Sequence, residues 1–347
     1  MRPLIQYSLK NQPEHPPMKA ILSKAPGLPD TLVLEDVPSP TAKAGEVVIS
    51  VKAVGVNFPD FLIIQDMYQY KPARPFSPGG EISGVVKSVG EGVTSFKVGD
   101  KVFGSTGAGG MAEEIAIPAN RMNMLPDFMP FDEAAAFLMT YGTSHYALKD
   151  RAHIKPGEKL LVLGAAGGVG LAAVELGKAM GAEVIAAASS QEKVDFCLSK
   201  GADRGFVYPE NPLTREQQKA FSETIKEISG GGVDVIYDGV GGDYAEPAVR
   251  ALNWEGRFLV IGFPAGIPKL PLNLTLLKSC QIVGVFWGAF VARDPKGHAE
   301  NLADLFRLYK EGAIRPHVSN RYPLARAAEA IKELSERRAK GKVVVTI

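Results

Sequence analysis

Four glycines lie within seven residues of the chain, between an apolar run and a helical run, in "LVLGAAGGVG" (161–170). Gly167 lets the backbone approach a pyrophosphate, and Gly170 lets the new helix pack closely on the strand. The free amides at the helix start then face the anion. Ala165 replaces the first glycine of G-x-G-x-x-G, so a tight turn without a ligand is the alternative. We predict that a dinucleotide pyrophosphate contacts Ala166, Gly167, Gly168, Val169 and Gly170.

The next apolar run ends in "VIAAASSQEK" (184–193), where sites that prefer NAD usually place an acid. A carboxylate there would accept from the ribose hydroxyls and repel a 2′-phosphate. Ser189 and Ser190 instead offer hydroxyl donors, and Lys193 follows one helical turn later. We expect Glu192 to point outward, and an ordinary surface role for Lys193 is the alternative. The pattern predicts NADPH as cofactor.

Apolar strands alternate with helical segments around this turn. We expect strands at 160–163, 184–188, 205–208, 233–237, 258–261 and 282–286, because parallel strands covered on both faces are apolar throughout. Six such strands are typical of a doubly wound dinucleotide-binding sheet. Before them, 19–126 holds short β-rich runs punctuated by Gly, Pro and Asp, which indicate a β domain. We expect a helix from Asp132, and "GKVVVTI" (341–347) as a closing strand.

Composition narrows the function classes. The formal net charge of +1 favours small neutral partners over nucleic acid or acidic membranes. Two cysteines cannot form a disulfide framework, so we expect a cytoplasmic protein, and no apolar window is long enough to span a membrane. Residues 1–17 are expected to be a loose extension. The charge run "KELSERRAKGK" (332–342) is interpreted as the solvated face of the last helix.

Several motifs together resemble the medium-chain dehydrogenase/reductase superfamily, within it the zinc-free NADPH:quinone oxidoreductase group. They are "VGVNFPDFLI", "PGGEISGVVKSVGEGVTSFKVGDKVFG", "YGTSHYALKDRAHIKPGEKLLVLGAAGGVG", "YDGVGG", "VIGF" and the terminal "GKVVV". The resemblance covers 18–347. It implies an α/β fold with a GroES-like β-barrel domain at 18–138 and 292–347, and a Rossmann domain, the doubly wound parallel sheet, at 139–291.

The same resemblance implies roles for individual residues. Asn57 and Tyr68 match positions that line the substrate cleft. Further matches to cofactor contacts are Thr143, Tyr208, Asp238, Gly239, Val240, Gly262, Phe263, Phe286, Trp287, Gly288 and Lys342, the last reaching the phosphates. Two alternatives stay open: Tyr68 as an edge aromatic with a polar tip, and Asn57 as a turn cap. The segment "QYKPARPF" departs from the family spacing.

Zinc-dependent members of that superfamily hold a catalytic metal on three side chains. At the matching positions this chain has Asn57, Gly80 and Met139. Gly80 and Met139 cannot bind zinc, and an amide is a poor ligand for it. We therefore expect no metal.

Without metal or nucleophile, direct hydride transfer from NADPH to a quinone or similar electron-poor carbonyl compound is the simplest chemistry. Asn57 and Tyr68 would donate hydrogen bonds to the oxygen that gains charge. The alternatives are an enoyl or 2-alkenal double-bond reductase and a noncatalytic NADPH-binding protein. The resemblance also suggests a homodimer joined through the sheet edge near 282–286.

Overall fold

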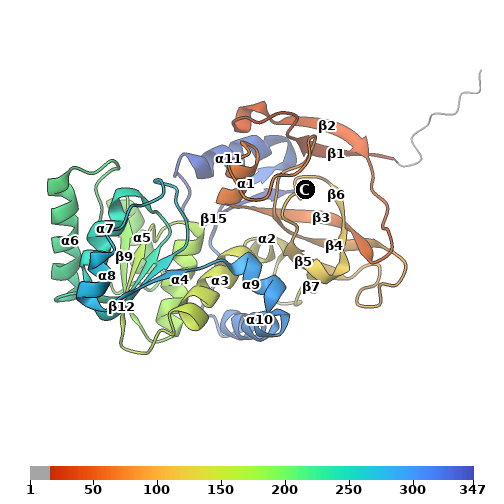
Figure 1. The fold of residues 1–347 in the computed structure, drawn as a ribbon. Helices are drawn as coiled ribbons and strands as arrows, with labels where there is room; N and C mark the ends of the chain where they lie inside the picture. The colour runs from red at the N-terminus through yellow and green to blue at the C-terminus, as the bar shows by residue number, and fades with distance from the viewer. Residues whose placement is uncertain (1–15) are drawn as a thin grey trace, which may run out of the picture.

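Six parallel strands form one of the two main sheets in the computed structural model, which describes residues 16–347 (Figure 1). The strand order β10-β9-β8-β11-β12-β13 confirms the predicted doubly wound sheet. The strands are β8 (Lys159–Leu163), β9 (Glu183–Ala188), β10 (Arg204–Val207), β11 (Val233–Asp238), β12 (Leu252–Val260) and β13 (Gln281–Gly284). The last expected strand was too long, because β13 ends at Gly284 and Phe286 already caps the next helix.

Both faces of this sheet are buried, which explains why its strands are apolar throughout. Leu160 and Val162 of β8 belong to one core, whereas Leu161 and Leu163 belong to the core on the opposite face. The first face packs against α4 (Gly168–Ala179) and α5 (Gln191–Ser199). The second packs against α6 (Arg215–Ser229), α7 (Ala245–Arg250) and α8 (Asn273–Lys278).

The other main sheet belongs to a barrel unit built from both ends of the described chain. Its order is β14-β15-β3-β4-β5-β7, and β6 also pairs with β3. The strands are β3 (Glu46–Val56), β4 (Glu81–Val89), β5 (Lys101–Ser105), β6 (Glu114–Pro118), β7 (Met122–Met124), β14 (Val318–Pro323) and β15 (Lys342–Thr346). The predicted closing strand is therefore confirmed: β15 pairs antiparallel with β3, Val343 opposite Val56.

Smaller elements complete the barrel unit. β1 (Pro17–Leu22) and β2 (Val33–Pro38) form an antiparallel ribbon, and α1 (Phe58–Ile63) contacts α11 (Ala327–Ser335). Because β1 begins at Pro17, pairing already includes the last residue of the expected loose extension. The rest of that expectation, residues 1–15, lies outside the described residues.

The helix expected from Asp132 is broken in the structure. α2 (Phe131–Ala134) follows Pro130, α3 (Leu138–His145) comes next, and a π-helical turn (Tyr146–Arg151) ends the segment. The break lies where the chain presses on β3: a Cβ on Gly55 would stand 1.8 Å from the Ala135 carbonyl oxygen. The prediction of one continuous helix was wrong because this tertiary contact overrides local propensity.

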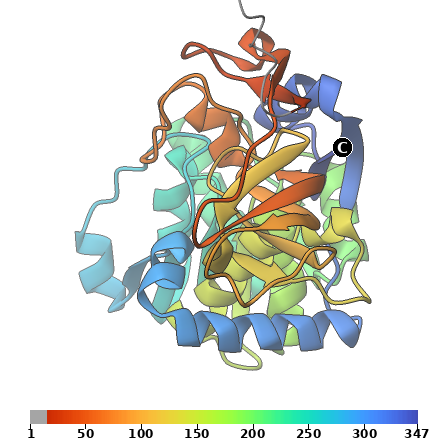
Figure 2. The ribbon, with the colours of Figure 1, turned by 90° about the vertical axis from the view of Figure 1, so that its right-hand side faces the viewer.

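Two helices near the chain's end lie beside the parallel sheet rather than in the barrel core. α9 (Trp287–Arg293) leads into α10 (Pro295–Lys310), which runs along one side of the molecule (Figure 2). Leu302 and Leu305 of α10 belong to the core around β8. The division into 18–138 with 292–347 against 139–291 stays a prediction, and this packing favours placing α10 with the sheet.

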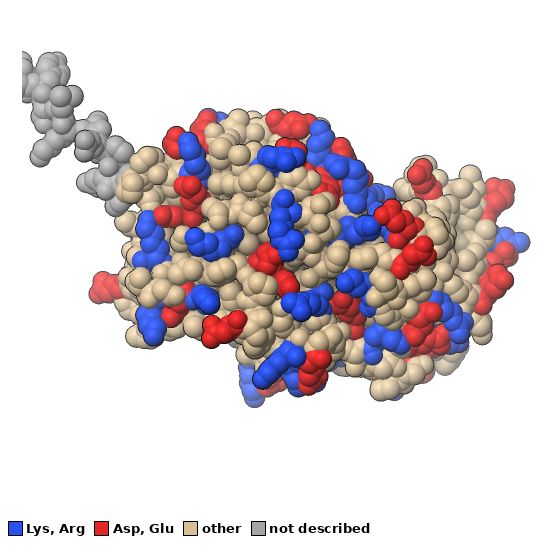
Figure 3. Space-filling view, turned by 180° about the vertical axis from the view of Figure 1, so that it is seen from behind, with Lys and Arg blue, Asp and Glu red and all other residues tan. Residues whose placement is uncertain are grey.

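Positive and negative side chains intermingle over the face shown in Figure 3, in keeping with the net charge of +1. No extended area of one sign stands out there. Within residues 16–347, no helix combines the length and the apolar character needed to cross a membrane.

Candidate active site between the two units

Three turns meet at the carboxyl edge of the parallel sheet, where ligands of such folds bind. They follow β8, β11 and β12. The Gly262 amide donates to the Asp238 carbonyl over 3.3 Å. A Cβ on Gly239 would lie 3.7 Å from a Val169 methyl, and one on Gly164 would lie 2.9 Å from a Val240 methyl. The structure thus brings together the predicted residues of these three turns.

The glycine-rich turn has the shape that an anion site needs. Gly167 is the N-cap of α4, and Gly170 packs so tightly that a Cβ would lie 2.2 Å from the Gly164 carbonyl oxygen. A Cβ on Gly167 would meet only that same oxygen, at 3.4 Å. Backbone atoms of the strand end therefore fill the space beside Gly170, while the space beside Gly167 is open for a pyrophosphate.

Ser189 and Ser190 follow β9, beside the start of α5. Ser190 caps this helix, its Oγ accepting from the Lys193 amide at 3.3 Å. The Lys193 side chain lies over the junction of β9 and α5, called the β9 corner below. Its Nζ donates to Ser189 Oγ at 3.3 Å and to the Arg337 carbonyl at 2.6 Å. As expected, Glu192 is exposed and points to another partner, forming a 2.7 Å ion pair with Lys340.

Sequence reasoning missed Arg337, because the charge run 332–342 was interpreted as a solvated helix face. That interpretation was wrong: α11 ends at Ser335, and Arg337 takes a left-handed conformation with φ of 57°. Its guanidinium donates to the Pro264 carbonyl over 3.0 Å. Burial lowers the pKa of Lys193. The charge of Glu192 raises this pKa, whereas the charges of Arg337 and Lys340 lower it. Such a corner favours an anion.

Aromatic side chains and a buried acid border this corner. The rings of Tyr208 and Tyr244 lie 4.9 Å apart, and burial raises the pKa of Tyr208 to about 12. Asp238 Oδ1 accepts from the amides of Val240 and Gly241, both at 2.9 Å. These two bonds hold the turn after β11, and burial raises the pKa of Asp238 to about 6.

The other end of the expected cofactor path lies between α3 and α9. Trp287 is buried against α3, where a Cβ on Gly142 would stand 2.9 Å from its indole. Thr143 beside it is half-buried, whereas Gly288 and Phe286 are exposed, Phe286 by 63%. Of the predicted residues here, Trp287 and Thr143 thus lie near each other, and Phe286 faces away from the core.

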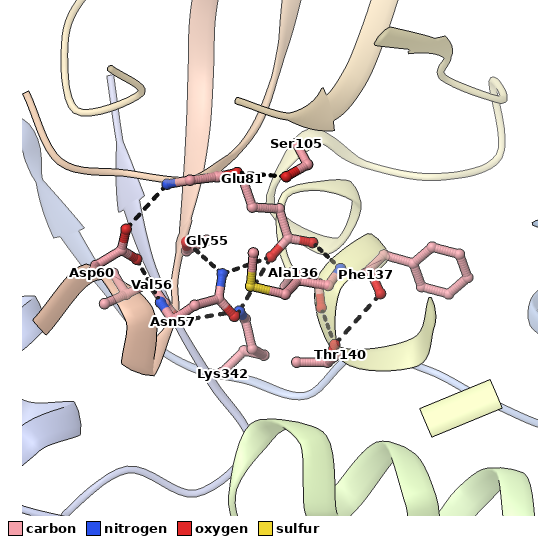
Figure 4. A network of polar contacts seen from close by, with 12 residues as sticks. Gly55, Val56, Asn57, Asp60, Glu81, Ser105, Ala136, Phe137, Thr140 and Lys342 are labelled. Carbon is pink, nitrogen blue, oxygen red and sulfur yellow. Dashed lines mark hydrogen bonds and ion pairs between the residues drawn. The ribbon is translucent and has the colours of Figure 1, made fainter. Parts of the chain in front are cut away.

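A buried polar cluster joins Asn57, Glu81 and Lys342 (Figure 4). Lys342 Nζ donates to Asn57 Oδ1 at 2.6 Å, and Asn57 Nδ2 donates to Glu81 Oε2 at 2.9 Å and to the Gly55 carbonyl at 3.1 Å. Glu81 Oε1 accepts from the Met139 amide at 2.9 Å. The resemblance implied that Lys342 reaches cofactor phosphates; here its ammonium donates to the barrel side instead.

Asp60 and Tyr68 lie next to this cluster. The Asp60 carboxylate accepts from the amides of Asn57 at 2.8 Å and of Gly79 and Gly80 at 3.1 Å (Figure 4). Asn57 also occupies the N-cap position of α1, where its backbone carbonyl accepts from the Asp60 amide while its side-chain oxygen accepts from Lys342. Burial and the charge of Asp60 raise the pKa of half-buried Tyr68. Its phenol therefore stays protonated and can donate.

The acidity of Asp60 makes stability depend on pH. Burial raises its pKa from 3.8 to about 6, although three amide hydrogen bonds and the charge of Lys342 each lower it. Its stabilising contribution is therefore complete below the unfolded pKa and is lost as pH rises through the folded pKa. In urea unfolding, we expect the free energy of unfolding of wild type, relative to that of Asp60→Asn, to fall by about 3 kcal/mol between about pH 3 and about pH 7. A constant difference would contradict this.

The described residues 16–347 contain no group of three or more His, Cys, Asp or Glu placed to hold a metal ion. The positions matched to zinc ligands are occupied by Asn57, Gly80 and Met139. Asn57 is already bonded to Lys342 and Glu81.

Comparison with known proteins decides the family. The model "Alcohol dehydrogenase GroES-like domain" matches 43–127, and "Zinc-binding dehydrogenase" matches 168–305. The quinone oxidoreductase-like protein 2 homolog of Nematostella vectensis is 38% identical over 94% of this chain and 88% of its own length. Quinone oxidoreductase-like protein 2 of Bos taurus is 36% identical, covering 91% and 89% respectively. The chain belongs to the quinone oxidoreductase group of the medium-chain dehydrogenase/reductase family.

Solved structures of medium-chain reductases agree with this assignment. A mycobacterial protein complexed with NADPH superposes with a TM-score of 0.87 at 32% identity, covering 95% of this chain and 100% of that one. Escherichia coli quinone oxidoreductase complexed with NADPH gives 0.85 at 30% identity, with the same coverage. The barrel unit is therefore the GroES-like domain of this family, and the six-stranded sheet is its Rossmann domain. The chain is an oxidoreductase by family.

Proposed function

We propose that this reductase uses NADPH to reduce a quinone or similar electron-poor carbonyl compound without a metal. The observation that carries the cofactor choice is the β9 corner. There Ser189, Lys193 and Arg337 meet, and Glu192, the acid next to Lys193 in the sequence, is engaged by Lys340. The NADPH in the related structures supports the same choice. Hydroxyl and cationic groups at this corner would hold a 2′-phosphate.

The residues present fit such a cofactor along one path. The turn 166–170 would hold the pyrophosphate with its amides, and Thr143 and Trp287 would flank the nicotinamide end. When bound, the cofactor supplies a hydride. The protein's part is to align donor and acceptor and to exclude water between the two units. No protein group has to form a covalent bond.

Tyr68 is the proposed hydrogen-bond donor to the acceptor oxygen. Its raised pKa keeps the phenol protonated, and no partner of its hydroxyl is found among the described residues. Asn57 shares this role in the proposal, although both of its amide hydrogens are directed to Gly55 and Glu81 in the structure. Donation from Asn57 therefore requires one of these bonds to open.

Tyr68→Phe is expected to lower kcat with a quinone about 10-fold to 100-fold while leaving the Kd for NADPH unchanged, because one donor to the developing charge is lost. Asn57→Ala is expected to lower kcat at least as much. Stopped-flow oxidation of NADPH across several acceptors measures both. Normal turnover by both variants with every acceptor would refute the assignment.

An acceptor panel tests the reaction itself. Quinones and 2-alkenals are offered at equal concentration while loss of NADPH is followed. We expect quinones to be reduced fastest. Faster reduction of 2-alkenals would favour the double-bond reductase, and tight binding of NADPH without oxidation by any acceptor would favour a noncatalytic protein. Metal analysis of active protein tests metal independence.

We also propose a cytoplasmic homodimer joined at the free edge of β13. Ile282 is 37% exposed on that edge, and Leu272 and Leu276 nearby are exposed by 76% and 79%. Exposed apolar side chains beside an unpaired strand favour pairing with a second copy. Sedimentation equilibrium tests the dimer, and Ile282→Lys should weaken it.

A further inference from the structure

Lys342 contacts both the glycine-rich turn 166–170, called the cofactor turn below, and Asn57, which is proposed to face the acceptor. Its ammonium donates to Asn57 Oδ1 at 2.6 Å, to the Val56 carbonyl at 3.1 Å and to Glu81 Oε2 at 3.4 Å (Figure 4). Its aliphatic stem passes the turn, where a Cβ on Gly168 would lie 3.0 Å from Lys342 Cδ. One side chain therefore bridges the two units.

The backbone beside Lys342 strengthens the same bridge. The Gly341 amide donates to the Ala166 carbonyl at 2.7 Å, and Gly341 pairs with Gly167 in a parallel bridge. Gly341 has φ of 70°, and a Cβ there would lie 2.4 Å from the His317 carbonyl oxygen. The glycine thus permits a close crossing that fixes β15 to the cofactor turn.

Burial makes the cluster depend on complete hydrogen bonding. Glu81, Lys342 and Asn57 are exposed by 0%, 4% and 7% respectively. All three ammonium hydrogens and both amide hydrogens have acceptors. A buried ion pair is stable only when its remaining hydrogen bonds are made, so the Asn57 amide is held in one orientation by Lys342 and Glu81.

We propose that Lys342 is a positioning residue that couples the cofactor turn to Asn57, so that binding of NADPH orders the acceptor side of the site. This proposal rests on the proposed function for its kinetic consequence. The coupling itself is physical: movement of the turn at Gly168 displaces the lysine stem, and the lysine head orients Asn57. The alternative implied by family resemblance is a direct contact between the ammonium and the cofactor phosphates.

Two variants test the coupling. Lys342→Met keeps an apolar stem over Gly168 and removes the ammonium, but it leaves the Glu81 carboxylate buried without a cation. Lys342→Met combined with Glu81→Gln removes both charges, so this double variant is expected to keep the fold where the single variant fails. Lys159→Met is the matched control, because this partly buried ammonium donates to the Ser229 carbonyl at the other end of β8.

Kinetics separate the two roles. Coupling predicts that the neutral double variant binds NADPH within about threefold of wild type, whereas kcat at saturating NADPH falls about 30-fold to 100-fold. The control should keep both values. A Kd for NADPH raised at least about 10-fold with unchanged kcat would overturn the proposal in favour of a phosphate contact.

Hydrogen exchange supplies a readout without turnover. In wild type, NADPH should slow exchange of the amides of Asn57, Gly79 and Gly80, which report on the acceptor side. In the double variant, NADPH should no longer protect these three amides but should still protect the amides of 164–170. Retained protection at both places would overturn the proposal. If none of the tested acceptors is reduced by wild type, the proposed function fails, whereas hydrogen exchange still decides the coupling.

Discussion

Gly170→Ala should raise the Kd for NADPH about 100-fold and lower the thermal midpoint by about 5 °C. The added Cβ would lie 2.2 Å from the Gly164 carbonyl oxygen and 2.9 Å from Ala165 Cα, and neither backbone atom can turn aside. The start of α4 must therefore move away from β8. Its amides then lose their bonds to the pyrophosphate, and two such bonds to a charged group are worth about 100-fold in Kd.

Gly167→Ala is the matched comparison. Its φ of −79° and ψ of 172° suit alanine, and the new methyl would meet nothing closer than 3.4 Å. The fold should be unchanged, with the thermal midpoint within about 1 °C of wild type. Affinity for NADPH should still fall about 10-fold, because the methyl occupies the space through which the pyrophosphate approaches. Unchanged calorimetric affinity would show that the pyrophosphate does not lie beside Gly167.

Ser189→Asp should reverse the choice of cofactor. A carboxylate beside Lys193 would neutralise the β9 corner and repel a 2′-phosphate, while accepting from the ribose hydroxyls of NADH. We expect the ratio of Kd for NADH to Kd for NADPH to fall about 100-fold, and Lys193→Ala to lower it about 10-fold. Calorimetry with both cofactors measures the ratio.

A suitable control is Lys178→Ala, which removes a lysine of α4 that pairs with Asp203 at 2.7 Å on the surface. Its ratio should stay at the wild-type value. If Ser189→Asp weakens both cofactors equally, or if wild type prefers NADH, the phosphate does not bind at this corner and the choice of NADPH is wrong.

The parallel sheet was predictable because its strands follow a local rule. A strand buried on both faces must be apolar along its length, and five of the six strands needed changes of only one or two residues at an end. The exception is β12, predicted at 258–261, which begins at Leu252 because its first half includes the polar residues Asn253 and Glu255.

The segment 131–151 was not predictable, because its break depends on the approach of Ala135 to Gly55 on a distant strand. Likewise Arg337 leaves the helix through a left-handed residue that the charge pattern does not encode.

The cofactor end of the site was more accessible to sequence reasoning than the acceptor end. The glycine turn and the serines after β9 are each contiguous, so their spacing carries the signal. Asn57, Glu81 and Lys342 come from three distant segments, and only the fold shows that they meet. One signal was present: Lys342 begins β15 directly before three valines, where a buried charge needs a partner. Glu81 carries a weaker signal, because β4 also contains Ser83 and Lys87.

The place of β15 between β14 and β3 also governs how the chain can be made. During synthesis the Rossmann sheet has all its strands once Gly284 has emerged from the ribosome, whereas β3, already beside β4 and β6, still lacks β15. The barrel sheet therefore cannot be completed before β15 has been made, which leaves one part of the β3 edge unpaired in the meantime.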